Sequence, residues 1–244
     1  MKLSIENLKL SFDDQLILND LSFGIQEQEF VTILGPSGCE KSTILNILAG
    51  LIDDYSGTIK VDGQKIQGVS EHFAYMPQDD LLLEWRTIVE NVTLYGKIHH
   101  DKSAKQKALA QFKTFGLEGY ENAYPSSLSG GMRQRAAFLR TSLCQADILL
   151  LDEPFGALDV ITRNDMQDWL LNLRKQYNRT TLLVTHDIDE ALYLSDRILV
   201  LSNKPSVILK EIDLSKEQKS RDWLFSQSEI KKEIFTLLRG ENHA

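Results

Sequence analysis

The chain has 244 residues, enough to bury a substantial core, and its 42% hydrophobic and 25% charged content is that of an ordinary globular protein. Its formal net charge of −8 argues against a nucleic acid partner, because a surface that holds phosphates is usually basic. The amino terminus lacks the apolar core of a signal peptide, and no run of about 18 apolar residues occurs, so we expect a cytoplasmic location. The cysteines, Cys39 and Cys144, form no metal or disulfide spacing pattern.

The first third of the chain has the apolar patterning of β-strands. An Asp62-Gly63 pair marks a hairpin turn, and the apolar spacing after residue 40 predicts a helix over 41–50 that ends at Gly50. The strands are expected over residues 2–10, 15–25, 29–35, 57–66 and 73–78.

From about residue 81 to 145 the pattern becomes helical, with helices expected over 87–98, 103–116 and 131–144. Strands and helices then alternate, which predicts parallel βαβ units. The strands of this part are expected over 147–153, 180–187 and 197–203, with helices over 161–177 and 189–196 between them.

The carboxyl-terminal tail, about residues 214–244, is expected to be helical, with a capping box at Ser226 and Glu229 and a glycine stop at Gly240. The predicted fold class is therefore α/β: a core with a mainly parallel sheet, an amino-terminal antiparallel β subdomain and a helical subdomain inserted at about 81–145.

A phosphate-binding loop needs a strand, a glycine-rich turn and a helix start, because the turn amides and the helix dipole both face an anion. "FVTIL", "GPSGCE" and "KSTILNILAG" supply these three parts in order. Lys41 would reach the β- and γ-phosphates, and Ser42 would bind Mg²⁺ through its hydroxyl. The alternative is a glycine turn that opens a helix without a ligand.

Two further motifs suggest anion and metal chemistry. In "ILLLDEP" a buried strand ends in two carboxylates. Asp152 would hold Mg²⁺, and Glu153 would orient and deprotonate water. The alternative is that these acidic residues only cap a helix, as is common at strand ends. In "LSGGMRQR" Ser129 and two glycines open a helix with exposed amides, which makes a second anion site. An ordinary capped helix would explain Ser129 but not Gly130 and Gly131.

With these motifs in order, the chain resembles the ATP-binding subunits of ABC transporters over nearly its whole length. "LSGGMRQR" resembles the family signature and "ILLLDEP" its Walker B segment. Gln78 resembles the Q-loop glutamine, Asp159 ends a D-loop-like "GALD", and His186 resembles the switch histidine. Phe12 falls where the family has an aromatic that stacks on adenine.

The resemblance implies a P-loop NTPase core, a single ABC-type domain over residues 1–244, and ATP and Mg²⁺ as cofactors. The implied catalytic residues are Glu153, His186, Gln78 and Lys41, and the implied Mg²⁺ ligands are Ser42, Gln78 and Asp152. The implied nucleotide-binding residues are Phe12, Gly35, Pro36, Ser37, Gly38, Cys39, Glu40, Lys41, Ser42, Thr43, Gln78, Ser129, Gly130, Gly131 and Asp159.

Several longer segments, among them "LLLEWRTIVENV" and "GALDVITRNDMQDWLL", resemble the subgroup that imports nitrate, sulfonates, taurine and pyrimidine precursors. This resemblance implies a head-to-tail homodimer when ATP is bound, transmembrane permease subunits, an extracytoplasmic solute-binding protein, and a peripheral location on the inner face of the membrane. Leu81, Leu82, Leu83 and Trp85 form an apolar cluster that would either receive a permease helix or belong to the core.

Glu40 departs from the phosphate-loop pattern, which has its second glycine at this position. At about 5 Å and an effective dielectric near 20, its charge would cost about 3 kcal/mol per unit of phosphate charge. Glu40 would turn to solvent and weaken binding, fill the anion site and block nucleotide, or be a single-position lesion in an intact enzyme. Because the other catalytic positions are present, we favour a single-position lesion as the origin of Glu40. Its side chain would then either weaken nucleotide binding or block the site. Replacing Glu40 with glycine is expected to raise ATP affinity at least tenfold.

Two alternatives to an importer ATPase remain open. A nucleotide-binding-defective structural subunit is supported by Glu40 alone. A soluble ABC-type ATPase of DNA repair or translation is less favoured, because such proteins have coiled-coil insertions, paired ATPase domains or basic surfaces. At Cys39 we expect the helix N-terminus to lower the thiol pKa, with Glu40 opposing that effect.

Overall fold

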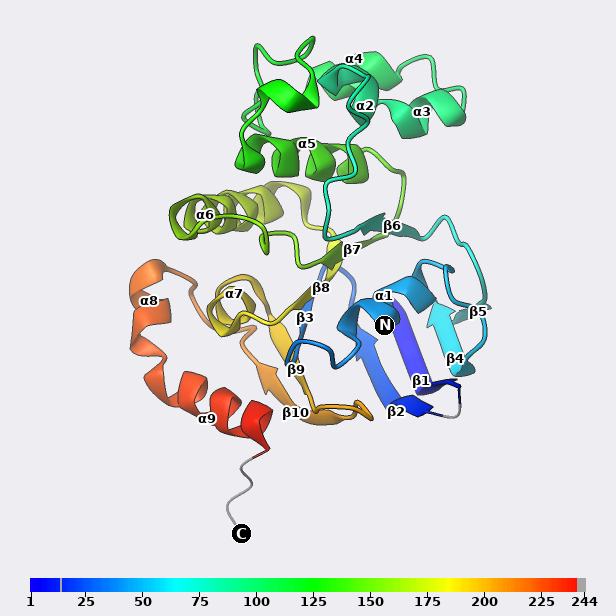
Figure 1. Cartoon of the computed structure of the whole chain (residues 1–244), viewed down its shortest axis with the longest axis vertical. Coiled ribbons are helices and arrows are strands. Elements are labelled where there is room, and N and C mark those ends of the chain that lie inside the picture. The colour runs from blue at the N-terminus through cyan, green and yellow to red at the C-terminus, as the bar shows by residue number, and fades with distance from the viewer. Residues whose placement is uncertain (14, 241–244) are drawn as a thin grey trace.

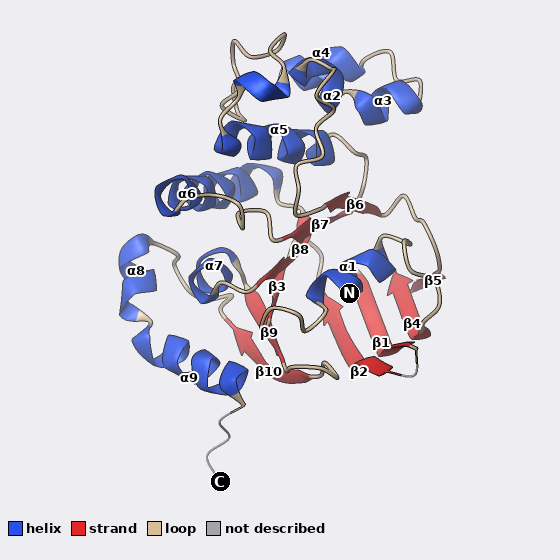
Figure 2. Ribbon diagram, in the orientation of Figure 1, coloured by secondary structure: helices blue, strands red, loops and turns tan. Residues whose placement is uncertain are grey.

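The structure is a computed structural model that describes residues 1–13 and 15–240. It contains a four-stranded sheet with the order β2-β1-β4-β5 and a six-stranded sheet with the order β10-β9-β3-β8-β7-β6. Figures 1 and 2 show the smaller sheet beside helix α1 and the helical part above the larger sheet. This arrangement is the predicted α/β core with a β-rich start and a helical insertion.

The smaller sheet is antiparallel throughout, as expected. The Asp62-Gly63 hairpin is confirmed, since both residues have positive φ angles, 50° and 79°, in the turn between two of its strands. The strands of this sheet are β1 (Leu3–Phe12), β2 (Gln15–Ile25), β4 (Ser56–Val61) and β5 (Gln64–Ile66).

The larger sheet is parallel except for β10 (Ile208–Asp213), which pairs antiparallel with β9 and was not expected from the sequence. Successive residues of its central strands face two different hydrophobic clusters, so both faces of the sheet are covered. Because parallel strands run in one direction, the segments that follow them meet at one edge. The parallel strands are β3 (Phe30–Leu34), β6 (Phe73–Met76), β7 (Ile148–Asp152), β8 (Thr180–Thr185) and β9 (Arg197–Leu201).

Helices α1 (Lys41–Leu48), α6 (Val160–Tyr177) and α7 (Ile188–Leu194) belong to the α/β core. The inserted part contains α2 (Ile88–Val92), α3 (Leu94–Ile98), α4 (Ala104–Leu109), a 3₁₀ turn (Pro125–Ser127) and α5 (Gly130–Ser142). The segment expected as one helix over 87–98 divides into α2 and α3 at Thr93, and the segment expected as a helix over 103–116 is an α-helix only over Ala104–Leu109. The Thr93 hydroxyl donates to the Val89 carbonyl oxygen at 2.7 Å, and the Thr93 amide donates to the same oxygen at 3.2 Å, a sharing that tends to bend a helix.

The tail forms α8 (Arg221–Ser226) and α9 (Ser228–Arg239), and Gly240 ends α9 with φ 70° as expected. The predicted capping box is wrong. Ser226 belongs to α8, where its hydroxyl donates to the Trp223 carbonyl oxygen at 2.7 Å, so it cannot cap α9. Residues 241–244 of the expected tail lie outside the described residues. Within the described ranges, none of the helices combines the length and apolarity needed to span a bilayer.

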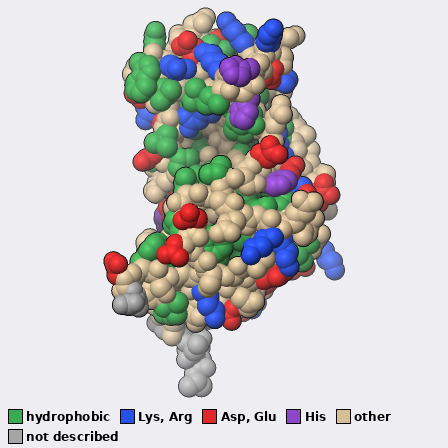
Figure 3. All heavy atoms as spheres, turned by 90° about the vertical axis from the view of Figure 1, so that its right-hand side faces the viewer, with side chains coloured by type: hydrophobic (Ala, Val, Ile, Leu, Met, Phe, Trp, Pro, Cys, Tyr) green, Lys and Arg blue, Asp and Glu red, His purple; other side chains and the backbone are tan. Residues whose placement is uncertain are grey.

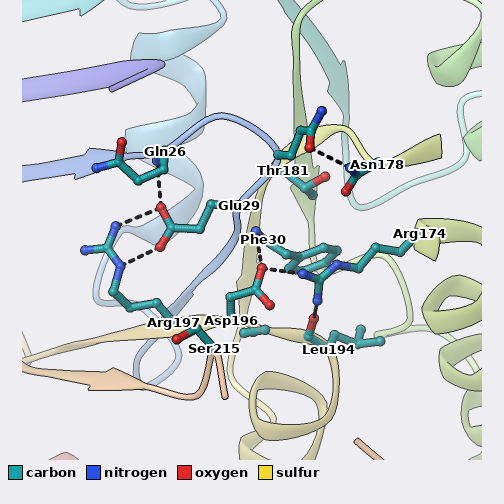
Figure 4. Close-up of polar contacts among 12 residues, drawn as sticks. Gln26, Glu29, Phe30, Arg174, Asn178, Thr181, Leu194, Asp196, Arg197 and Ser215 are labelled. Atoms are coloured by element: carbon teal, nitrogen blue, oxygen red, sulfur yellow. Dashed lines mark hydrogen bonds and ion pairs between the residues drawn. The ribbon is translucent and has the colours of Figure 1, made fainter. Parts of the chain in front are cut away.

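Ion pairs fix the amino ends of the parallel strands. Arg197, the first residue of β9, donates to Glu29 before β3 at 2.7 Å, and Arg174 of α6 pairs with Asp196. Asp196 also accepts the Phe30 amide at 2.9 Å (Figure 4). These contacts tie β3, β9 and α6 together at the edge of the sheet opposite the candidate site.

Candidate functional site

The segment between β3 and α1 forms a tight loop over the carboxyl edge of the sheet. The Gly35 amide donates to the Thr185 carbonyl oxygen of β8 at 3.4 Å, and the Cys39 amide donates to the Pro36 carbonyl oxygen at 3.3 Å. A Cβ atom on Gly35 would lie 2.7 Å from the Cys39 Sγ atom, so a side chain at Gly35 does not fit this packing. The loop is therefore wound as a phosphate-binding loop requires.

Lys41, the first residue of α1, lies across this loop. Its ammonium group donates to the carbonyl oxygens of Gly35 and Pro36, each at 3.0 Å, and lies 3.9 Å from a carboxylate oxygen of Glu153. Only 4% of the Lys41 side chain is exposed. The charge is thus held at the mouth of the loop, where phosphate oxygens could replace its carbonyl partners.

Ser42 and Asp152 meet at the carboxyl end of β7. The Ser42 hydroxyl donates to Asp152 at 2.8 Å, and the Tyr75 hydroxyl donates to the second oxygen of the same carboxylate at 3.1 Å. Burial raises the pKa of both Asp152 and Tyr75. A hydroxyl beside a carboxylate is a hard oxygen pair of the kind that Mg²⁺ accepts together with phosphate oxygens. These residues therefore fit a Mg²⁺ ion.

Sequence reasoning missed Tyr75. A tyrosine in a short apolar strand is usually part of the core, and only the pairing of β6 with β7 brings its hydroxyl to Asp152.

Glu153 and His186 follow the neighbouring strands β7 and β8. The His186 Nδ1 atom lies 2.9 Å from a carboxylate oxygen of Glu153. Glu153 has φ 41°, and its amide donates to the Val184 carbonyl oxygen of β8 at 2.9 Å, which fixes its direction. Gln78 lies close by, since a Cβ atom on Gly156 would be 3.8 Å from its Nε2 atom and 3.6 Å from Glu153 Oε2. The structure thus gathers the expected residues from four strands.

The "LSGG" motif lies elsewhere, at the start of α5. Ser129 caps this helix by accepting the Met132 amide at 3.3 Å. A Cβ atom on Gly131 would lie 2.9 Å from Thr162 Cγ2, and one on Gly130 would lie 3.4 Å from Leu158. Gly131 therefore also has a packing role, because it lets α5 approach α6, whereas a Cβ atom on Gly130 would make only an ordinary contact. Figure 1 shows α5 and α1 on opposite sides of β6 and β7.

Asp159 is the N-cap of α6, where one carboxylate oxygen accepts the amides of Ile161 and Thr162 at 3.1 Å each. Phe12 is the last residue of β1, and 47% of it is exposed, which leaves its ring free to stack on a flat partner. Both residues are exposed at positions that the sequence singled out.

The apolar cluster after Gln78 divides between surface and core. Leu81 is 59% exposed and Trp85 is 73% exposed, whereas Leu82 is buried. Leu82 therefore belongs to the core, as one alternative had it, whereas Leu81 and Trp85 are accessible to a partner.

A hollow of about 560 Å³ lies in the helical part of the molecule, and Figure 3 shows it below the upper group of histidine and lysine side chains. It is separate from the phosphate loop. Tyr95, His99, Lys107, Cys144, Tyr177 and Arg179 are among its lining residues.

Glu40 caps α1 in the left-handed conformation, with φ 70° and ψ 34°, which explains why glycine is usual at this position. Its carboxylate does not lie in the phosphate loop. One oxygen accepts the Thr43 hydroxyl at 2.6 Å, and the other pairs with the Lys204 ammonium group at 2.5 Å. The bonds from Lys204 and then Thr43 lower the pKa of Glu40, so the group is charged.

The expectation of an acidic thiol at Cys39 is wrong. The side chain is almost fully buried, and this burial raises the pKa of the thiol more than the helix start lowers it.

Comparison with known proteins agrees with this geometry. The protein family described as "ABC transporter" matches residues 18–156. The chain is 42% identical over 217 residues to the "Aliphatic sulfonates import ATP-binding protein SsuB" of Bacillus cereus, a match that covers 87% of this chain and 86% of the relative. It is 44% identical over 233 residues to the "Formylaminopyrimidine import ATP-binding protein ThiZ" of Halalkalibacterium halodurans, covering 93% and 91%.

Among solved structures, the chain is similar to the dimeric post-hydrolysis state of the ATP-binding cassette MJ0796 bound to ADP and Pi. The TM-score is 0.73 at 29% identity, and the match covers 87% of this chain and 98% of that one. The family match, these relatives and the fold agree: the chain belongs to the ABC transporter family, as an ATP-binding subunit with a transport-coupled ATPase fold.

Proposed function

We propose that this chain powers a membrane importer for a small solute such as a sulfonate, nitrate, taurine or a pyrimidine precursor, by binding and hydrolysing ATP. The printed functions of the SsuB and ThiZ relatives support this class of solute. The observation that carries the proposal is the meeting of Lys41, Ser42, Asp152, Glu153 and His186 at one edge of the sheet.

Each residue has a distinct role in this proposal. Lys41 binds the β- and γ-phosphates, and Glu153 orients and deprotonates the attacking water. His186 holds the Glu153 carboxylate in position through its Nδ1 atom. Ser42, Asp152 and Gln78 would hold Mg²⁺, which supplies charge neutralisation at the phosphates when bound.

The remaining residues bind the nucleotide. The loop of residues 35–43 surrounds the phosphates and offers them backbone amides, and Phe12 stacks on the adenine. We propose that residues 1–244 act as one ABC-type domain, and that two copies pack head to tail. Ser129, Gly130, Gly131 and Asp159 of one copy then complete the site of the other, because α5 lies away from the phosphate loop of its own chain.

Transmembrane permease subunits and an extracytoplasmic solute-binding protein complete the proposed transporter, which places this chain on the inner face of the membrane. The exposed Leu81 and Trp85 offer an apolar surface for a permease helix. A nucleotide-binding-defective structural subunit is the second candidate, and Glu40 is the observation that favours it.

Mg²⁺-dependent ATP hydrolysis by the purified chain tests the proposal, with Glu153→Gln as the inactive control. We expect phosphate release by the parent chain and by Glu40→Gly, and none above background by Glu153→Gln. Hydrolysis by Glu40→Gly alone would favour the structural subunit. Co-purification with membrane subunits separates an importer from a soluble ABC-type ATPase.

A further inference from the structure

The Glu40 carboxylate is held by the side chains of Thr43 and Lys204. Thr43 belongs to the first turn of α1, and Lys204 belongs to the connection between β9 and β10. Among the described residues, the carboxylate makes no capping bond to the amides of α1, so these amides stay available to an anion.

The segment that carries Lys204 is fixed to the phosphate loop itself. The Ser206 hydroxyl is fully buried and donates to the Cys39 carbonyl oxygen. The backbone of Ser206 also bonds to β2, donating to the Ile17 carbonyl oxygen at 2.9 Å and accepting the Asn19 amide at 3.0 Å. Lys204 is therefore presented to Glu40 from an anchored position.

We propose that Lys204 is a positioning residue that keeps Glu40 out of the phosphate site and so makes this atypical loop competent for ATP. The inference rests on the proposed ATP-binding function. The Lys204 charge neutralises the carboxylate, and the ion pair fixes its direction. Without Lys204, only the Thr43 hydroxyl would hold the Glu40 carboxylate. Its unpaired negative charge would then lie next to the loop amides, where it would compete with the triphosphate for these amides and repel it.

Calorimetric titration with Mg²⁺ and the slowly hydrolysed analogue ATPγS tests this role in four proteins: the parent, Lys204→Ala, Glu40→Gly and the double variant. We expect Lys204→Ala to weaken binding by about tenfold when Glu40 is present, and by less than about threefold when residue 40 is glycine. Lys204→Arg should restore binding to within about threefold of the parent, because it keeps the charge.

Lys210→Ala is the matched control. Lys210 of β10 is also paired with a glutamate, but with Glu233 of α9 and not with a residue of the phosphate loop, so its removal should leave ATPγS affinity unchanged. An equal loss of ATPγS affinity on Lys204→Ala, whether residue 40 is glutamate or glycine, would mean that Lys204 acts on the nucleotide itself. No loss of affinity in either background would mean that Lys204 has no role. Both results would overturn the inference.

The two proposals fail in different ways. Binding by Glu40→Gly but not by the parent would show that Glu40 blocks the site despite Lys204, which overturns the positioning role alone. No binding by any of the four proteins would overturn the proposed ATP-binding function.

Discussion

Glu190 is a buried carboxylic acid in α7, the helix that follows β8. One oxygen accepts the Thr185 hydroxyl at 3.0 Å, while the other has no partner among the described residues. Burial, with the nearby Asp187 charge, raises the pKa of Glu190 to about 8. The group is therefore a neutral acid at neutral pH, and it lies next to the segment that carries His186.

This pKa predicts a pH dependence of stability. Between about pH 4.5 and about pH 8 the folded chain keeps a proton on Glu190 that the unfolded chain has released, so the free energy of unfolding falls as pH rises, by up to about 1.4 kcal/mol per pH unit. Glu190→Gln should remove this slope. Urea unfolding of both proteins at two pH values within this window measures it, and equal slopes would contradict the assignment.

The residues of the site differ in how far the sequence could predict them. Asp152, Glu153 and His186 could be placed because each follows a buried strand, and parallel strands end at one edge. The surroundings of Glu40 could not, because Lys204 is far away in sequence and reaches Glu40 only through the packing of the β9–β10 connection. The raised pKa of the Cys39 thiol was not predicted either. The sequence shows that Cys39 precedes a helix, but it does not show that the side chain is buried.

At the scale of elements, the core strands and α6 were predicted well, whereas the helices of the inserted part and the edge strand β10 were predicted poorly. The strands of the core and α6 follow their apolar patterns, whereas β10 alternates half-buried and exposed residues at a sheet edge and so gives a weak signal. The inserted part divides at Thr93, where the hydroxyl and the amide of Thr93 compete for the Val89 carbonyl oxygen. Such a competition depends on side-chain geometry that periodicity does not contain.

The end of α1 offers a test at this scale. Gly50 has φ 75°, and a Cβ atom there would lie 2.2 Å from the Val69 amide nitrogen and 2.3 Å from the Gly68 carbonyl carbon. Gly50→Ala should therefore lower the free energy of unfolding by about 3 kcal/mol, through backbone strain and displacement of the 68–69 segment.

Gly63→Ala is the matched control for this prediction. Gly63 has a similar φ of 79° but open space around it, so only the strain of about 1 kcal/mol should remain. Chemical unfolding of both variants gives the comparison, and equal losses would show that the close approach at Gly50 has no energetic consequence.

At the scale of the whole molecule, the two elements that we propose to bind the nucleotide phosphates lie apart in one chain. The phosphate loop is at the carboxyl edge of the larger sheet, while the Ser129 motif is attached to α6 through the close contact of Gly131 with Thr162. Because this contact holds α5 against α6 and away from the phosphate loop of the same chain, the proposed head-to-tail dimer brings the Ser129 motif to the nucleotide of a second copy.

This separation predicts a dimer that depends on nucleotide. With Glu153→Gln to prevent hydrolysis, Mg²⁺ and ATP should convert the chain from monomer to dimer in sedimentation experiments. Adding Ser129→Arg should abolish the dimer, because a bulky side chain fills the start of α5, yet ATP should still bind to the monomer through the phosphate loop. A dimer that persists with Ser129→Arg would contradict the head-to-tail arrangement. Loss of ATP binding by the monomer would place Ser129 in the site of its own chain instead.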